Sequence, residues 1–222
     1  MSGMRVLDLG ARDGLYSFEC EKRGAEEIIA LDYSPPDSTG FNVAKKLLAS
    51  KVEWVTANVY EIDQLNLGKF DFILFLGLIY HLRHPYLAID KIHDVLKVGG
   101  TVAVESHVID GGFVDESGNW LNLDELNPRL SKLNVAQIYE SGKLVNDKSN
   151  AWAPSIDTLV AMFKNSGFEV SESWSYYFRG GLSATAIEID SDHPRYMDSS
   201  SNFPMLSSSK AIRRPANISN VT

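Results

Sequence analysis

Short apolar runs that alternate with helical patterns constrain the fold of this chain more than any other feature. The runs read MRVLDL (4–9), EIIALD (27–32), VEWVTA (52–57), FDFILFL (70–76) and TVAVESH (101–107). Nearly continuous apolarity, rather than strict alternation, is typical of parallel strands that helices cover on both faces. The alternation of such strands with helices predicts an α/β fold built on five parallel strands.

Two later helices and a pair of strands complete the predicted sheet. Pro85 suits the first turn of one helix, which is expected to run to Lys97 and to stop at Gly99. Ser155 is a favourable N-cap for the other helix, and Gly167 is its expected end. The β-rich runs FEVSESWSYYF and GLSATAIEI follow, and the RGG between them predicts the turn of an antiparallel pair.

The chain is expected to form one domain with a long insertion. Residues 1–190 make up the domain, and the Ser-rich residues 191–222 are predicted to be a flexible tail. Within the domain, residues 108–153 form an irregular segment rich in Asn and Gly. An insertion of this length is more often a lid or binding loop than a linker, so we predict a lid over the site.

The charge balance and the single cysteine narrow the range of functions. The net charge is −8, and because the tail carries +2, residues 1–190 carry −10. Such an acidic body disfavours broad binding to nucleic-acid phosphates, which needs a basic face, without excluding a local basic patch. Cys20 alone excludes an internal disulfide and is expected to be a buried thiol in a helix. Neither a signal peptide nor an apolar run of about 18 residues is recognised, so we predict a cytoplasmic protein without a membrane partner.

The carboxyl ends of the first two strands carry the residues expected to hold a cofactor. In open parallel sheets, ligands bind beyond these ends, near the point where the strand order reverses. Strand one ends in Asp8 and Gly10, and a helix is expected to begin near Gly14. Strand two ends in Asp32, at a spacing suited to accepting both hydroxyls of a ribose. Together these residues predict a nucleoside cofactor.

The glycine spacing discriminates between two classes of cofactor. A dinucleotide site requires G-x-G-x-x-G, whereas this loop has Gly10-x-Arg12-x-Gly14. The spacing is nearer to D-x-G-x-G-x-G, the loop of proteins that bind S-adenosylmethionine (SAM), with Asp8 as its acid. SAM carries no phosphate, so a complete phosphate-binding set of backbone amides is not required. Its ammonium group would be attracted by Asp8.

Arg12 stands where such loops carry their middle glycine. Two roles remain open for its side chain. It could form an ion pair with Asp13 or Asp32 that clamps the loop, or it could contact a carboxylate of the cofactor or substrate. Arg12 is therefore counted among the predicted cofactor-binding residues.

Strands three and four add further predicted cofactor contacts. Asn58 and Val59 end strand three, where an amide beside an apolar side chain can hydrogen-bond and cover an adenine ring. The alternative for Asn58 is a plain turn asparagine. Leu76, at the end of strand four, is also expected to contact the cofactor.

The segment GLIYHLRHP, which follows strand four, is expected to face the acceptor. It places Tyr80, His81 and Arg83 at the carboxyl edge, and His107 ends strand five at the same edge. Histidine can remove a proton near neutral pH, which O- or N-methylation of a weakly acidic group requires. The alternative for His81 is that it only caps or packs against the next helix. Tyr80, His81 and His107 are the predicted catalytic residues, whereas Glu105 is expected to be packed or paired.

In combination these motifs resemble the class I SAM-dependent methyltransferases, and most nearly the branch of the bacterial tRNA wobble-uridine carboxymethyltransferase. The resemblance covers about residues 4–190. Besides the glycine loop it rests on three features. The segment after strand four matches at Gly77, Tyr80, His81 and Pro85. The VIDG after strand five matches at Val108 to Gly111, and an Asn before a Pro-Ser helix start matches at Asn150, Pro154 and Ser155.

The resemblance implies a Rossmann-like seven-stranded sheet of order 3-2-1-4-5-7-6, with the last strand antiparallel, and SAM as cofactor without a metal. It also implies that Tyr80 lies near the transferred group and that Arg179 contacts the substrate, while the position after strand four predicts substrate contacts for Tyr80 and Arg83. The tRNA enzyme has a further region before its cofactor domain, which helps it bind RNA and a carboxylated SAM. Strand one is expected here at residue 4, so tRNA and carboxy-SAM stay open.

Three functions are consistent with the sequence. The first, favoured by the acidic body, is methyl transfer from SAM to an O or N nucleophile of a small-molecule acceptor. The second is methyl or carboxymethyl transfer to RNA, as to a tRNA wobble uridine. The third is a SAM-fold protein that binds its ligand without turnover, and a homodimer is compatible with each.

Overall fold

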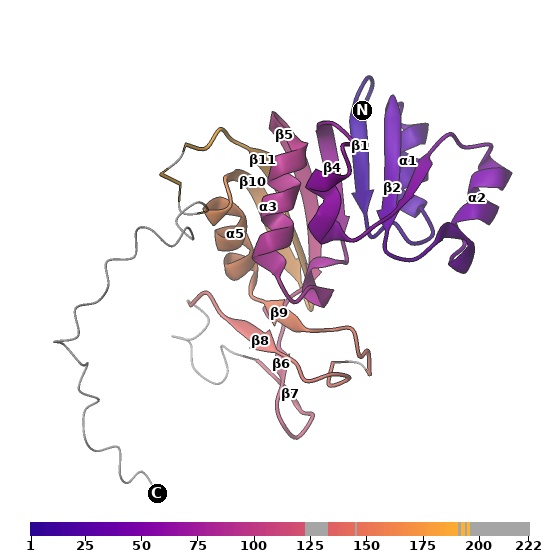
Figure 1. Cartoon of the computed structure of the whole chain (residues 1–222). Coiled ribbons are helices and arrows are strands. Elements are labelled where there is room, and N and C mark those ends of the chain that lie inside the picture. Colours follow the sequence, from indigo (N-terminus) through magenta and orange to yellow (C-terminus); the bar gives the residue numbers. More distant parts are fainter. Residues whose placement is uncertain (123–132, 145, 191, 194, 196–222) are drawn as a thin grey trace, which may run out of the picture.

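A seven-stranded sheet of order β10-β11-β5-β4-β1-β2-β3 organises the molecule (Figure 1). The structure is a computed structural model that describes residues 1–122, 133–144, 146–190, 192–193 and 195. The strands of the sheet are β1 (Arg5–Leu9), β2 (Glu27–Asp32), β3 (Glu53–Thr56), β4 (Phe70–Leu76), β5 (Leu96–His107), β10 (Phe168–Tyr176) and β11 (Arg179–Ala186). Strands β1 to β5 pair in parallel, whereas β11 runs antiparallel to β5 and to β10. The predicted strand order is therefore confirmed, because β10 and β11 are the sixth and seventh strands of this sheet.

Helices pack on both faces of the sheet, as the apolar strands predict. They are α1 (Leu15–Lys22), α2 (Phe41–Leu48), α3 (Pro85–Val95) and α5 (Ile156–Asn165). On one face, Ile92 of α3 and Phe163 of α5 pack in a core that includes Phe75 of β4. On the other face, Phe18 of α1 and Phe41 of α2 stack with ring centroids 5.2 Å apart. Side chains alternate between the two faces of each strand, so neighbouring residues of one strand belong to different cores.

Smaller elements lie at the carboxyl ends of the parallel strands (Figure 1). The 3₁₀ turns η1 (Pro36–Ser38), η2 (Val59–Gln64) and η3 (Ile79–His81) follow β2, β3 and β4. The segment after β5 forms two short antiparallel pairs, β6 (Phe113–Val114) with β7 (Trp120–Leu121) and β8 (Ala136–Ile138) with β9 (Trp152–Pro154). The amide of Ala151 donates to the carbonyl of Tyr80 at 3.0 Å, which fixes β9 beside η3.

The predicted boundaries of the last helix are confirmed. Helix α5 begins after Ser155, whose hydroxyl accepts a hydrogen bond from the amide of Thr158 at 3.3 Å. Its last helical residue is two positions before Gly167, which has a φ of +87°. A side-chain N-cap and a left-handed glycine after the end are the signals that sequence reasoning uses for helix limits.

The predicted end of the helix that starts at Pro85 was wrong. Helix α3 ends at Val95, and Leu96 is already paired with Phe70 as the first residue of β5. Gly99 has a left-handed φ of +81°, but it lies inside β5, opposite a register shift between β4 and β5. Burial of Leu96 in the sheet core outweighed the helix-ending pattern around the glycine.

The predicted turn between the last two strands was also wrong. The RGG segment lies within β11, and Tyr177 and Phe178 form the turn, with Tyr177 at a φ of +51°. A Cβ on Gly181 would lie 2.4 Å from the carbonyl oxygen of Val104 on the neighbouring strand. The glycine is therefore required for close packing in the sheet, and not for a turn.

The structure describes only parts of the insertion and of the tail. Residues 123–132 and 145 of the insertion lie outside the described residues, and its role as a lid stays a prediction. Of the tail, residues 192, 193 and 195 are described, and the predicted flexibility of residues 191, 194 and 196–222 lies outside the described residues. The guanidinium of Arg195 forms ion pairs with Asp90 and Asp94 of α3. Among the described helices, none is long and apolar enough to cross a membrane.

Cys20 is buried within α1, as expected for a packing thiol. Burial, together with the nearby negative charge of Asp8, raises the pKa of the thiol to about 11. The thiol is therefore protonated at neutral pH and is a poor nucleophile.

Candidate functional site

The glycine loop after β1 is tied to the end of β2 by backbone hydrogen bonds. The amides of Gly10 and Ala11 both donate to the carbonyl of Leu31, at 2.8 and 3.1 Å. Gly10 and Gly14 have φ values of +75° and +80°, which residues with side chains rarely adopt. The loop is thus held open at the carboxyl edge of the sheet by its own backbone, at the position predicted for a cofactor.

Asp8 is a buried acid directly beneath this loop. Its side chain is 3% exposed, and its carboxylate accepts a hydrogen bond from the hydroxyl of Ser17 at 2.6 Å. Burial raises the pKa of Asp8 to about 6, although the hydrogen bond from Ser17 acts to lower it. A buried carboxylate with so little compensation is stabilised by a cation placed beside it.

Asp32 ends β2 and is bound by two backbone amides. One carboxylate oxygen accepts from the amide of Ser34 at 2.9 Å, and the other from the amide of Arg12 at 3.1 Å. A carboxylate offers about four acceptor positions, so each oxygen keeps a lone pair for a further donor. The pair of oxygens can therefore accept the two hydroxyls of a ribose without losing its support.

Arg12 contributes through its backbone more than through its side chain. Its φ of +48° is the left-handed conformation that the middle glycine of such loops adopts easily. The guanidinium is 83% exposed and lies 4.0 Å from the carboxylate of Asp13, at the limit of an ion pair. An exposed pair at this distance contributes little to stability, and the bond to Asp32 comes from the backbone amide of Arg12 and not from the side chain named in the prediction.

The remaining residues predicted to contact the cofactor lie at the ends of β3 and β4: Asn58 and Val59, predicted at the adenine, and Leu76. Asn58 is exposed and caps η2, since its side-chain oxygen accepts from the amide of Tyr60 at 3.1 Å. This is the plain turn role, which leaves its amide nitrogen to donate elsewhere. Val59 is buried in the core, and Leu76 is half-buried.

Tyr80, Arg179 and Glu105 form one group at the carboxyl edge. The Arg179 guanidinium makes a two-pronged ion pair with the Glu105 carboxylate. Its remaining nitrogen lies 3.4 Å from the Tyr80 hydroxyl, and its carbon is 5.2 Å from the centre of that ring. The predicted substrate residues Tyr80 and Arg179 are thus brought together, and Glu105 is paired as expected, whereas Arg83 is exposed on the surface.

His81 is oriented by a serine from the insertion. The Ser149 hydroxyl lies 3.1 Å from Nδ1 of His81 and donates to the carboxylate of Asp147 at 2.5 Å. A hydroxyl has one proton, so when that proton is given to Asp147 the oxygen can only accept from His81. His81 must then carry its proton on Nδ1, which leaves Nε2 as the basic nitrogen.

His107 is more deeply buried than His81. Its side chain is 8% exposed, and its Nε2 has no hydrogen-bond partner among the described residues. Burial, with a smaller effect from the Arg179 guanidinium, lowers the pKa of His107 to about 4. His107 is therefore neutral at pH 7 and a weak base, which makes it a poor candidate for proton removal.

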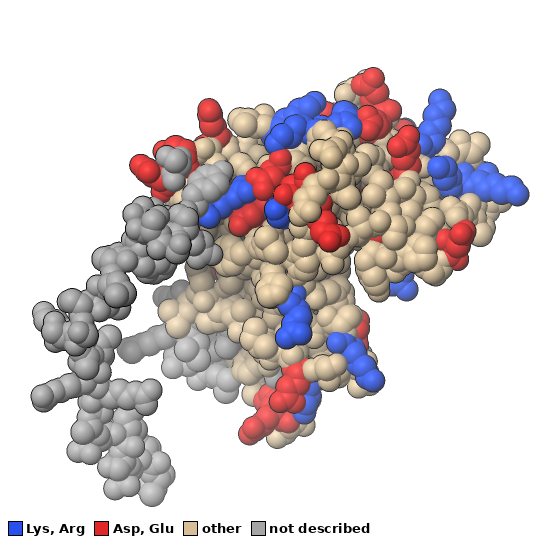
Figure 2. Space-filling view, in the orientation of Figure 1, with Lys and Arg blue, Asp and Glu red and all other residues tan. Residues whose placement is uncertain are grey.

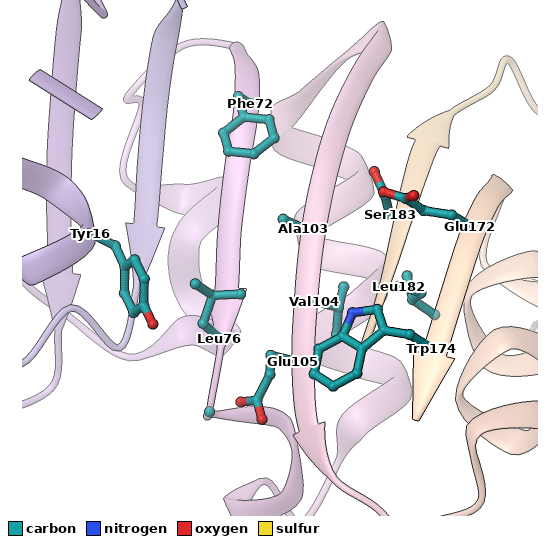
Figure 3. A pocket seen from close by; sticks show the side chains of 11 residues that line it. Tyr16, Phe72, Leu76, Ala103, Val104, Glu105, Glu172, Trp174, Leu182 and Ser183 are labelled. Carbon is teal, nitrogen blue, oxygen red and sulfur yellow. The ribbon is translucent and has the colours of Figure 1, made fainter. Parts of the chain in front are cut away.

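A cavity of about 560 Å³ opens beside these groups, on the α1 side of the sheet. Figure 3 shows Tyr16 of α1, Leu76 of β4, Glu105 of β5 and Trp174 of β10 around one space over the strands. Gly77, with a φ of +69°, also lines it, and a Cβ there would meet Glu105 at 3.8 Å. The cavity thus extends from the predicted cofactor edge across the open part of the sheet.

Sequence reasoning missed several residues that the fold brings to this edge. Ser17 follows Asp8 by nine positions, so a small polar residue on the buried side of α1 was an available signal. Ser149 and Trp174 carried no such signal, because their partners come from distant strands and loops. No group of three metal-ligating side chains occurs in the described part of the chain.

The fold and this edge define a class of protein. A Rossmann-like sheet of this order, a glycine loop with a buried acid before it and an acid ending β2 are together characteristic of SAM-dependent methyltransferases. The chain belongs to the family described as "Methyltransferase domain", whose model matches residues 1–173. The predicted class is therefore confirmed at the level of family and fold.

Curated relatives are similar over most of this chain. A tRNA U34 carboxymethyltransferase of Shewanella pealeana is 28% identical over 171 residues, which cover 76% of this chain and 44% of that protein. The corresponding protein of Campylobacter hominis is 30% identical over 141 residues, 63% of this chain and 45% of that protein. The chain spans less than half the length of these relatives.

Solved structures share the fold at low identity. A SAM-dependent methyltransferase from Mesorhizobium loti has a TM-score of 0.62 and 16% identity, covering 83% of this chain and 91% of that one. The 1,6-didemethyltoxoflavin-N1-methyltransferase of Burkholderia thailandensis, solved with 1,6-didemethyltoxoflavin and S-adenosylhomocysteine, has a TM-score of 0.59 and 16% identity. The alignment covers 84% of this chain and 72% of that protein.

Proposed function

We propose that this chain binds SAM and transfers its methyl group to an O or N nucleophile of a small-molecule acceptor. The observation that carries this proposal is the cavity of about 560 Å³ beside Leu76 and Gly77, next to the cofactor edge. Small-molecule sites have volumes of roughly 300–1,000 Å³, so a cavity of this size suits a compact acceptor.

The residues of the cofactor edge fit SAM in their chemistry. Asp32 offers two oxygens with spare lone pairs for the ribose hydroxyls. Asp8 is a buried acid whose charge the ammonium group of SAM would compensate. The loop from Gly10 to Gly14 presents backbone without bulky side chains near that end, and Asn58 keeps a free amide for the adenine.

SAM supplies an already activated methyl group, so the protein mainly has to orient the acceptor and remove its proton. Tyr80 and Arg179 contact each other beside Glu105, which lines the cavity, and can position the acceptor there. Nε2 of His81 is the proton acceptor in this proposal, since Ser149 holds its other nitrogen. His107 stays neutral and contributes shape rather than a charge.

A second candidate is modification of RNA, because the curated relatives are named as acting on tRNA U34. Nucleic-acid binding requires a continuous basic surface. On the face in Figure 2, Lys and Arg side chains are interspersed with Asp and Glu side chains over the described residues. This mixture and the charge of −8 favour the small-molecule acceptor over RNA.

The first experiment separates cofactor binding from turnover. Calorimetric titration should give binding of S-adenosylhomocysteine and none of NADH. The protein with methyl-labelled SAM is then offered small phenols and heteroaromatic amines in one arm and total tRNA in the other. Label in the small molecules supports the proposal, and label in tRNA alone supports the second candidate. Binding without label in either arm overturns both in favour of a non-catalytic SAM-binding protein.

A further inference from the structure

A continuous run of aromatic rings leads from Tyr80, at the carboxyl edge of the sheet, to the surface. Tyr80 and His107 have ring centroids 6.2 Å apart, and His107 stacks with Phe178 at 6.1 Å and an interplanar angle of 18°. Phe178 in turn lies 4.3 Å from Trp120 at 35°. These four rings come from η3, β5, the β10–β11 turn and β7, so only the tertiary fold assembles them.

The outer end of this run is exposed to an unusual degree. Trp120 is 50% exposed, and Tyr177 and Tyr176, which extend the run beyond Phe178, are 65% and 71% exposed. Large rings left in water lose the burial energy that would otherwise stabilise the fold. A connected group of them beside a candidate active site is therefore a feature that needs a ligand to explain it. We call Tyr80, His107, Phe178 and Trp120 the aromatic wall.

The aromatic wall is held in place rather than loosely displayed. The amide of Val108 donates to the carbonyl of Phe178, and the amide of Gly111 to that of Tyr177, both at 2.9 Å. A Cβ on Gly111 would lie 2.3 Å from the Tyr177 carbonyl oxygen, so the turn can approach only because this residue is glycine. The left-handed Tyr177 is fixed by the same contacts. Rings fixed in this way cost little entropy when a ligand stacks on them.

Two further observations restrict the chemistry of that ligand. The Arg179 guanidinium at the inner end is already paired with Glu105, so the wall offers no uncompensated charge there. His107 is only 8% exposed, so the accessible rings of the wall are Tyr80, Phe178 and Trp120. An uncharged ring suits flat aromatic faces that offer no free charge.

We propose that the aromatic wall binds the methyl acceptor by stacking, and that the acceptor is an uncharged planar aromatic or heteroaromatic ring. This inference rests on the proposed function and names the class of its acceptor. The ring could come from a free small molecule or from a base in RNA, since both present the same flat face.

The test uses the full chain saturated with S-adenosylhomocysteine, whose binding is measured first for every variant. Uracil and 7-hydroxycoumarin are titrated as planar probes, with cyclohexanol as the non-planar control, by ligand-observed NMR. Both planar probes should bind more tightly than cyclohexanol. Trp120→Ala should weaken their binding by about tenfold, because loss of a stacking partner has that scale, and Trp120→Phe should retain most of it.

Tyr86→Ala is the matched control. Tyr86 is 46% exposed, nearly as much as Trp120, but it belongs to α3 and lines neither the cavity nor the aromatic wall. Equal probe binding by wild type and Trp120→Ala overturns the inference, as does a loss of equal size in Tyr86→Ala. No preference for planar probes over cyclohexanol also overturns it, if the RNA hairpin described next shows no Trp120-dependent binding either.

A second binding experiment distinguishes a free aromatic ring from an RNA base, and the failure of the aromatic wall from the failure of the proposed function. A 17-nucleotide RNA hairpin with an unpaired uridine loop replaces the free probes. If the hairpin binds in a Trp120-dependent way and the free rings do not, the wall is supported while the small-molecule acceptor is overturned. If S-adenosylhomocysteine itself does not bind, the proposed function fails before the wall is tested.

Discussion

The proposed cofactor half of the edge, with Asp8, Arg12, Ser17 and Asp32, and its proposed acceptor half, with His81, Glu105, Ser149 and Arg179, are built in different ways. In the cofactor half, the key hydrogen bonds join residues close in sequence, nine positions apart for Ser17 and Asp8 and 20 for Arg12 and Asp32. In the acceptor half, Ser149 and His81 are 68 positions apart, and Arg179 reaches Glu105 across 74. The first half is thus formed by one β-α-β unit, whereas the second exists only after the whole sheet has assembled.

The two halves also differ in how their charges are compensated. Asp8 in the cofactor half is buried with one hydroxyl as partner, so its ionisation is costly. In the acceptor half, Arg179 is paired with Glu105, and Asp147 is bonded by Ser149. We infer that the cofactor half is completed electrostatically by its ligand, whereas the acceptor half is complete without one.

The largest expected effect concerns Asp8. Its folded pKa of about 6 lies above the unfolded value of about 3.9, so its contribution to stability is full below pH 4 and is lost as the pH rises through 6. Asp8→Asn should therefore change the free energy of unfolding little at pH 4 and raise it by about 3 kcal/mol at pH 8. Urea denaturation at both pH values measures this difference.

The same acid should make cofactor binding pH-dependent. Affinity for S-adenosylhomocysteine should increase as the pH rises through about 6 in wild type, because the ionised Asp8 attracts the ammonium group, and Asp8→Asn should remove this dependence. The exposed Asp37→Asn is the control for both readouts. An equal gain in stability at pH 4 and pH 8 would contradict the assignment.

The next largest effect is expected at Asp32. Asp32→Ala removes the proposed acceptors for both ribose hydroxyls and also releases the amides of Arg12 and Ser34. Two hydrogen bonds to a charged group predict a loss of roughly 100-fold in affinity for S-adenosylhomocysteine. Calorimetry measures the loss, and Asp37→Ala is the matched control. A loss below about threefold would show that the cofactor half is not where the ribose lies.

A smaller effect tests how the acceptor half is assembled. Wild-type His81 should carry its proton on Nδ1, and Ser149→Ala should shift the ratio of its neutral tautomers toward the Nε2 proton by about fivefold, the value of one hydrogen bond. Nitrogen-15 chemical shifts of labelled histidine report this ratio. Ser149→Thr keeps the hydroxyl and should behave as wild type. The same ratio in all three proteins would remove Ser149 from the acceptor half.

The smallest effect is expected at Arg12. Arg12→Gly relieves a left-handed φ but adds freedom to the unfolded chain, so the net gain in stability should be about 0.5 kcal/mol. Ala49→Gly, at a φ of +50° after α2, is the matched control with the same expected gain. Affinity for S-adenosylhomocysteine should change by less than about twofold, since the guanidinium is exposed. A tenfold loss of affinity would mean that the Arg12 side chain reaches the ligand.

The sequence alone determined the elements whose signals are local. Apolar runs gave the five parallel strands, and Ser155 and Gly167 defined the last helix, because capping and periodicity act within a few residues. The glycine loop and the acids after β1 and β2 were recognisable for the same reason, since one β-α-β unit forms them. Resemblance to known methyltransferases supplied the strand order, which no local signal determines.

Only the tertiary structure decided which distant residues meet. Burial of Leu96 extended β5 at the expense of α3, and the close approach of Val104 required Gly181 inside a strand instead of at a turn. The contact of Ser149 with His81 and the stacking of Trp120 on Phe178 depend on strand register and on the insertion folding against the sheet. Contacts of this range carry no periodic or capping signal, so the sequence predicted the cofactor half and the fold created the acceptor half.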